Sequence, residues 1–471
     1  MAGVKEEEKK MSNTQKLAEL IESIKFEDLP DSVIEQVKRL TIHTIGVSVA
    51  SGPIRTTRNA IKLAEENGGK EEATIWGGHG KKVPAETAAF ANATQADVLD
   101  WEDCSWTGHP SAGAIAAAFS VAEAKHKSGK DYITAVAAAY EGYQRIASSV
   151  QPSREYLKDH YWGLSSWQIF GSTLAAAKLY GFDADKINQA IGATVYVTPV
   201  AMGLHADGTT KSDIYHFAHG TDAYNGIFAA KITELGFDNG RDYLDGPKGY
   251  WSTVSDQTDN AWFSRNLRDD NYLINETYLK HWPANMWIQT PLEVLDAIYK
   301  EHPFGADEVK KITISPITGL TAFYYGDTSR STLDAQFNAS FCFAAYILDP
   351  VPTAKWFTED QLERKEILDL AAKVTAEGDA FTPRDNFDLF KQRDFPTTTV
   401  KVELNDGTVL EKSIAYPKGH PVNNTTLEEE YELFTRITEP FIGKEKAEKF
   451  IRAIDNLQDV ADIADISENL F

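Results

Sequence analysis

An alanine-rich segment from Ala112 to Ala124 constrains this chain more than any other feature. Alanine has the highest helix propensity of the amino acids, and its small side chain lets neighbouring helices approach closely. A helix with so few polar side chains is destabilised when it faces water. The segment therefore predicts a tightly packed interior helix with further helices around it.

The rest of the N-terminal half has helical periodicity. Apolar residues recur at helical spacing from Leu17 to Ile24 and again after Pro30, where Gly46 would allow a close helix contact. A helical pair is predicted over 165–197, interrupted by Gly181-Phe182-Asp183, and another helix over 221–235. This half of the chain is expected to be helical throughout.

The pattern changes after about residue 265. Residues 309–314 alternate like a strand, and residues 399–404 and 409–415 flank Asn405-Asp406-Gly407, a strong hairpin signal. A helix is predicted over 331–348, and an amphipathic helical tail over 427–456. Because 471 residues exceed what one hydrophobic core supports, the predicted fold class is mainly α with a smaller α+β domain.

Charge and composition exclude several functions. The net charge of −23 repels nucleic acid and anionic membranes, so neither is expected as a partner. The charged start of the chain has no apolar core of a signal peptide, no stretch approaches the roughly 20 apolar residues of a membrane span, and a cytoplasmic location is expected. Two cysteines, Cys104 and Cys342, make no disulfide framework. An anionic substrate would require local cations.

The strongest candidate site is an acidic block followed by a histidine. Asp97, Asp100, Glu102 and Asp103 precede His109, which leads through Pro110-Ser111 into the alanine-rich helix. A carboxylate beside an imidazole fixes its tautomer and stabilises its cation, which favours proton transfer near neutral pH. A surface acidic cluster with a structural histidine is the alternative. Metal binding by Asp100, Glu102, Asp103 and His109 is not expected, because their spacing fits no standard zinc or calcium loop.

Two basic segments are candidates for binding an anion. Lys211 is followed by His216 and His219, and Lys280 by His281. Such groups bind carboxylates and stabilise a developing enediolate, although a solvated loop lysine and histidines on a helix face are the alternative. The sequence contains no Gly-x-Gly-x-x-Gly, P-loop, His-Glu-x-x-His or Gly-x-Ser-x-Gly motif, so the dinucleotide, nucleotide, zinc-protease and α/β-hydrolase classes lack their signatures.

The acidic block, His109-Pro110-Ser111 and the alanine-rich helix together resemble the MmgE/PrpD family, which includes 2-methylcitrate dehydratase, cis-aconitate decarboxylase and iminodisuccinate epimerase. The resemblance continues in order through 170–181, 236–237, 280–284, 405–407 and 417–421. It implies an all-helical domain from residues 1–268 and 420–471, an α+β lid domain at 269–419, and a homodimer without metal or organic cofactor. It places the site between the domains, with His109, Asp100 and Lys280 as catalytic residues.

The resemblance also implies a set of substrate-binding positions: Lys211, Cys104, Trp162, His160, Asn285, His216, Tyr324 and Tyr325. Which of Lys211, His216 and His219 faces the site stays open, as does the choice between the two tyrosines. The sequence departs from the family where Trp162 lies near a usual histidine and where Asn285 replaces another. Losing imidazoles removes positive charge, so a substrate less charged or bulkier than 2-methylcitrate is expected.

The expected function is that of a lyase acting on a small carboxylic acid. His109, oriented by Asp100, would transfer a proton at a carbon next to a carboxylate or carbonyl, while Lys280 would stabilise the enolate-like charge. Dehydration or hydration, as in 2-methylcitrate dehydratase, is the first expectation. Decarboxylation and epimerisation share the same intermediate and are the alternatives, and a non-catalytic binding protein is the alternative of another class.

Overall fold

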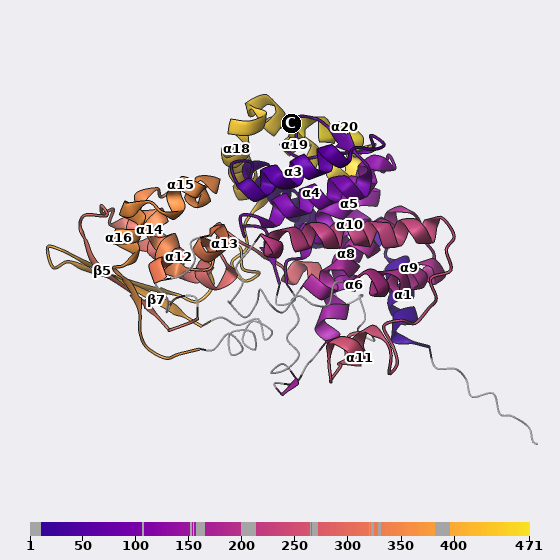
Figure 1. Ribbon diagram of the computed structural model, residues 1–471, viewed down its shortest axis with the longest axis horizontal. Coiled ribbons are helices and arrows are strands. Elements are labelled where there is room, and N and C mark those ends of the chain that lie inside the picture. The colour runs from indigo at the N-terminus through magenta and orange to yellow at the C-terminus, as the bar shows by residue number, and fades with distance from the viewer. Residues whose placement is uncertain are drawn as a thin grey trace, which may run out of the picture.

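The computed structural model describes residues 11–105, 108–150, 153, 155–156, 165–198, 213–263, 265, 272–319, 321, 325–327, 331–381 and 396–471. The predicted fold class is confirmed, since a large helical part lies beside a smaller part that carries a sheet (Figure 1). Within the described residues, no helix combines the length and the apolar character needed to cross a membrane.

The helical part is formed by the N-terminal half of the chain together with its C-terminal helices. Its described α-helices are α1 (Asn13–Ser23), α2 (Asp31–Ala50), α3 (Arg55–Asn67), α4 (Ala85–Asp97), α5 (Pro110–Ala124), α6 (Gly129–Ser149), α8 (Ser165–Leu179), α9 (Ala184–Val197), α10 (Ile214–Glu234), α11 (Tyr250–Val254), α18 (Leu427–Ile442), α19 (Lys444–Asp455) and α20 (Ala464–Ser467).

Helix α5 is the predicted interior helix. It packs against α4, α6, α8 and α10, and its residues from Pro110 to Glu123 are all buried. A Cβ atom at Gly113 would lie 3.0 Å from Ser172 Oγ on α8, so the small side chains do permit a close approach. His109 immediately precedes this helix and is its N-terminal capping residue.

Helix α10 begins at Ile214, so the predicted start at Thr221 was wrong. Tertiary packing supports the additional turns. A Cβ atom at Gly220 would lie 2.3 Å from Thr94 Oγ1 on α4, and one at Gly226 would lie 2.5 Å from Ser172 Cβ on α8. Because only glycine fits at these two contacts, α10 lies directly against both helices.

The C-terminal helices α18 and α19 pack against α2, and Figure 1 shows them with the helical part of the molecule. A Cβ atom at Gly46 of α2 would lie 2.9 Å from the ring of Phe434 on α18, which confirms the close contact predicted at this glycine. The tail is two helices rather than the single one predicted over 427–456, because Gly443 between them has a positive φ of 80°.

The smaller part contains a four-stranded sheet packed with helices. Its elements are α12 (Met286–Glu301), β5 (Val309–Ser315), α13 (Thr332–Gln336), α14 (Ala339–Leu348), α15 (Glu359–Leu362), α16 (Lys365–Ala371), β6 (Val374–Ala376), β7 (Thr398–Leu404) and β8 (Val409–Ile414). The strand order is β6-β5-β7-β8, with β5 and β6 parallel and the other pairs antiparallel.

Two local predictions for this part have different outcomes. Strands β7 and β8 form the predicted hairpin across Asn405-Asp406-Gly407, where Gly407 has a φ of 93°. The helix predicted over 331–348 is instead two helices, α13 and α14. The chain breaks at Asn338 because its side chain accepts hydrogen bonds from Ser340 N and Phe341 N and so caps α14.

Short strand pairs complete the described fold. Strand β1 (Ala73–Thr74) pairs with β2 (Lys82–Val83), and β3 (Asp103–Cys104) pairs with β4 (Tyr278–Leu279). The second pair brings residues 278–280 beside the end of the acidic block, and Lys280 N donates a hydrogen bond to Glu102 O at 3.3 Å. The predicted domain boundaries at 268/269 and 419/420 stay a prediction.

Candidate active site

His109 lies at the centre of a buried polar cluster. Only 7% of its surface is exposed. Its Nδ1 atom is hydrogen-bonded to Glu102 Oε1, and its Nε2 atom lies 3.1 Å from the hydroxyl of Tyr215 at the start of α10. The imidazole is therefore held by a carboxylate on one nitrogen, while the other faces a phenol.

Lys280, which directly follows β4, approaches the same carboxylate. Its ammonium group is fully buried and contacts Asp100 Oδ1, while Nζ lies 2.6 Å from Glu102 Oε1 and 3.5 Å from His109 Nδ1. The expectation that Asp100 orients His109 was wrong, because Glu102 occupies that position and Asp100 pairs with Lys280. The backbone of Asp100 has a φ of 49°, a left-handed conformation that turns the chain between Asp97 and Glu102.

The charges of this cluster are interdependent. Burial disfavours a carboxylate at Glu102, but the Lys280 and His109 cations outweigh it and lower the pKa of Glu102 to about 2. Burial and the Lys280 ammonium each lower the pKa of His109, yet Glu102 and Asp97 raise it above its ordinary value. The pKa of Lys280 is raised because Asp100 and Glu102 outweigh its burial. The centre thus favours an imidazolium at His109.

Asp97, the last residue of α4, lies among three imidazoles. His216 Nδ1 is 2.7 Å from Asp97 Oδ2, while His219 Nε2 and His109 Nδ1 are 3.2 and 3.7 Å from Asp97 Oδ1. Burial and the nearby carboxylates of Glu102 and Asp100 raise the pKa of Asp97 well above its ordinary value. Asp97 thus connects the two histidines of α10, His216 and His219, to the cluster around His109.

Gln168 of α8 ties His219 to the backbone of His109. Its Nε2 atom is 2.6 Å from His219 Nδ1 and donates to His109 O at 3.2 Å. Tyr215 contacts the cluster and also the smaller part of the molecule. Its ring packs edge-on against that of His109, with the ring centroids 6.1 Å apart, and against that of Phe337, with the centroids 5.4 Å apart. Phe337 of the smaller part therefore covers one edge of the tyrosine.

The predicted site residues separate into four groups, of which the last, Asn285 and Tyr325, lies in the smaller part of the molecule. His109, Asp100, Lys280 and His216 meet in the cluster, together with His219. Cys104 lies beside it in β3 but is buried, and burial raises the pKa of its thiol. A third group lies outside the described residues: Lys211, Trp162, His160 and Tyr324.

Asn285 and Tyr325 have local contacts in the smaller part. The Asn285 side chain caps α12 by accepting a hydrogen bond from Trp287 N at 3.1 Å. Tyr325 is fully buried, and its ring lies 4.6 Å from that of Phe341. The described contacts of these two residues are thus with the core of the lid and its helices, and their expected role in substrate binding stays a prediction.

Sequence reasoning missed Tyr215 and Gln168 and gave Asp97 no role of its own. One available signal was the spacing of Tyr215, His216 and His219, since positions three or four apart lie on one helix face. That signal was hidden because the predicted helix began too late. Gln168 offered no signal, since a single glutamine in an apolar helix has many possible partners.

Asp97, Glu102 and His109 each present a ligand atom within 4.8 Å of the others, as a bound metal ion would require. However, the Lys280 ammonium already lies 2.6 Å from Glu102 Oε1. A second cation in that position would meet strong repulsion at low dielectric. The donor set therefore fits an ion-paired proton-transfer centre better than a metal site.

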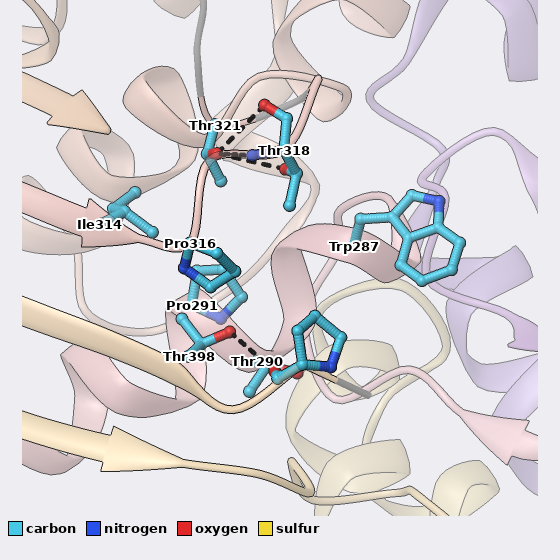
Figure 2. A pocket seen from close by; sticks show the side chains of 9 residues that line it. Trp287, Thr290, Pro291, Ile314, Pro316, Thr318, Thr321 and Thr398 are labelled. Carbon is cyan, nitrogen blue, oxygen red and sulfur yellow. Dashed lines mark hydrogen bonds between the residues drawn. The ribbon is translucent and has the colours of Figure 1, made fainter. Parts of the chain in front are cut away.

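A separate small pocket lies between α12, the end of β5 and the start of β7. Figure 2 shows its lining and the hydrogen bonds between Thr318 and Thr321. The described residues of its walls carry hydroxyl, apolar and aromatic groups but no titratable side chain, so these residues offer no proton donor near neutral pH. The lining residues are Trp287, Thr290, Pro291, Ile314, Pro316, Thr318, Thr321, Pro396 and Thr398.

Comparison with known families covers nearly the whole chain. Residues 15–262 match the MmgE/PrpD N-terminal domain, and residues 282–459 match the MmgE/PrpD C-terminal domain. The chain belongs to the MmgE/PrpD family. The predicted family is therefore confirmed, and its ordered motifs were a sound basis for the prediction.

Several curated members of this MmgE/PrpD family are similar over their full length. Human cis-aconitate decarboxylase is 24% identical over 468 residues, which cover 96% of this chain and 93% of that protein. The mouse cis-aconitate decarboxylase is 22% identical, covering 96% and 92%, and that of Aspergillus terreus is 21% identical, covering 96% and 95%. These relatives are named as decarboxylases, which are lyases, and the likeness supports the lyase class.

Proposed function

We propose that this chain is a lyase that removes carbon dioxide from an unsaturated carboxylic acid of the cis-aconitate type. The observation that carries the proposal is the buried His109 imidazole, held by Glu102 on Nδ1 and facing the Tyr215 hydroxyl with Nε2. A decarboxylation of this kind needs a proton donor at carbon, and a cationic imidazole is such a donor near neutral pH. The relatives named as decarboxylases favour this reaction over the dehydration expected from the resemblance.

The reaction balances with one proton. When the carbon bearing the departing carboxylate is next to a carbon–carbon double bond, the electron pair of the broken C–C bond forms a new double bond. The original double-bond pair then moves to the far carbon, where an adjacent carboxylate delocalises it. His109 Nε2–H donates its proton to that carbon, and His109 regains a proton from water. The products are carbon dioxide and an acid with a shifted double bond.

Lys280 acts on this reaction through Glu102. Its ammonium is paired with two carboxylates, so its charge is already neutralised and it holds Glu102 ionised beside His109. The role first expected for Lys280, direct stabilisation of the substrate's negative charge, is therefore replaced by a positioning role. Binding of substrate carboxylates by Lys211 stays a proposal, as do the homodimer and the cytoplasmic location.

Dehydration of a hydroxy acid is the second candidate. The pairing of His109 with Tyr215 at 3.1 Å favours it, because an elimination of water needs one group to take a proton from carbon and another to protonate the departing hydroxide. Neutral His109 would be the base and the phenol the acid. The surroundings that raise the pKa of His109 disfavour the neutral imidazole that this reaction needs.

The test uses purified protein in heavy water with cis-aconitate and a panel of unsaturated, hydroxy and keto acids, followed by NMR and release of carbon dioxide. Decarboxylation with one deuterium on the carbon next to a carboxylate is expected. His109→Gln should abolish it, whereas His126→Gln should not, because His126 lies on the surface and pairs with Asp462. Loss of water without carbon dioxide would identify a dehydratase, and no reaction with any acid would favour a binding protein.

A further inference from the structure

His43 of α2 is a second buried histidine with two strong partners. Only 2% of its surface is exposed. Its Nδ1 atom lies 2.8 Å from Glu430 Oε2 on α18, and its Nε2 atom lies 2.6 Å from the carbonyl oxygen of Trp101. Glu430 is equally buried. The imidazole thus bridges a C-terminal helix and the acidic block.

The protons of His43 are determined by these partners. A carbonyl oxygen only accepts hydrogen bonds, so Nε2 carries a hydrogen that it donates to Trp101 O. Burial lowers the pKa of His43, but Glu430 and the Trp101 carbonyl raise it above its ordinary value. A cationic imidazole donates from both nitrogens and satisfies both partners.

Trp101 lies between Asp100 and Glu102, two of the carboxylates of the cluster. Asp100 before it contacts Lys280, and Glu102 after it contacts both Lys280 and His109. The side chain and backbone of Lys280 hold this short segment through Glu102. A hydrogen bond from His43 of α2 holds the carbonyl of Trp101 between them.

We propose that His43 is a positioning residue for the active site, which fixes the Trp101 carbonyl and thereby sets Glu102 against His109. This inference rests on the proposed function of His109. A purely structural histidine would need only its ion pair with Glu430 to join α2 to α18, and the bond to Trp101 would then be irrelevant to catalysis. Misplacing a catalytic group by about 1 Å costs on the order of a hundredfold in rate.

Two variants separate these roles. The side-chain nitrogen of asparagine lies close to the place of Nδ1, and that of glutamine close to the place of Nε2. His43→Asn therefore keeps a donor for Glu430 and loses the one for Trp101, whereas His43→Gln does the reverse. Each variant loses one buried hydrogen bond, so similar decreases in melting temperature are expected.

If His43 is a positioning residue, the two variants should differ in kcat. In His43→Asn, kcat should fall at least about tenfold with KM within about twofold, because the reacting groups are misplaced while the binding contacts persist. In His43→Gln, kcat should stay within about threefold of the parent protein. Phe434→Leu is the stability control, since Phe434 packs against Gly46 one turn further along the same interface of α2 and α18.

A second readout is independent of turnover. The titration of His109, followed by ¹⁵N NMR, reports its contact with Glu102. The pKa of His109 should fall in His43→Asn and stay unchanged in His43→Gln and in Phe434→Leu. Equal effects of the two His43 variants, or an unchanged His109 titration in His43→Asn, would overturn the proposal. If the parent protein acts on none of the acids, the proposed function fails, while the titration still decides the positioning role.

Discussion

Replacing Glu102 by glutamine tests whether this carboxylate holds the centre together. The change preserves side-chain shape but removes the charge between Lys280 and His109. In the folded protein the pKa of Glu102 is about 2, against an ordinary value of 4.5. Each pKa unit corresponds to about 1.4 kcal/mol, so the ionised form gains about 3 kcal/mol from folding. Removing one partner of a buried ion pair costs a similar amount.

The pH dependence follows from the direction of this shift. A carboxyl group whose pKa is lowered by folding contributes its full stability above its unfolded value, and the contribution is lost as pH falls through the folded value. The free energy of unfolding of Glu102→Gln should therefore be about 3 kcal/mol lower than that of the parent protein at pH 7. The difference should shrink progressively between pH 4.5 and about 2.

Urea unfolding followed by tryptophan fluorescence measures this difference at pH 7 and at successively lower pH. Glu411→Gln is the matched control, because Glu411 is exposed on β8 and should change the free energy of unfolding by less than about 0.5 kcal/mol. A loss at pH 7 below about 1 kcal/mol for Glu102→Gln would refute the reasoning, since it would mean that Glu102 carries no net stabilising charge pair.

Three further outcomes are expected. The cation of His109 is the proposed acid, and the pKa of His109 is raised above its ordinary value of 6.5, so kcat should fall as the pH rises through this raised pKa. A kcat that is unchanged from pH 6 to 9 would exclude His109 as the proton donor. Tyr215→Phe removes the hydroxyl 3.1 Å from His109 Nε2 and should lower kcat about tenfold. Tyr224→Phe, on the outer face of the same helix, is the control and should leave kcat unchanged. Equal kcat values in the two variants would exclude a role for the Tyr215 hydroxyl. Gly46→Val introduces a Cβ atom 2.9 Å from the ring of Phe434 and should lower the free energy of unfolding by about 1 to 3 kcal/mol without changing kcat. Chemical denaturation and an activity assay measure the two quantities. An unchanged free energy of unfolding would mean that α18 shifts freely on α2.

Local patterns predicted the elements of this fold well where short-range physics dominates. The alanine-rich segment became the buried helix α5, and Asn405-Asp406-Gly407 formed the turn of the hairpin between β7 and β8. Predictions were less accurate where packing decides. The first turns of α10 depend on Gly220 fitting against α4, and this contact between distant segments cannot be predicted from local spacing.

The candidate site shows the same division. Sequence by itself determined that His109 has carboxylates nearby, and the family resemblance implied that Lys280 belongs to the same site. Only the tertiary structure decided which carboxylate does what, because the left-handed turn at Asp100 directs that side chain to Lys280 and leaves Glu102 for His109. Tyr215, Gln168 and Asp97 reach the centre from three different helices, and such contacts depend on how helices pack rather than on their spacing along the chain.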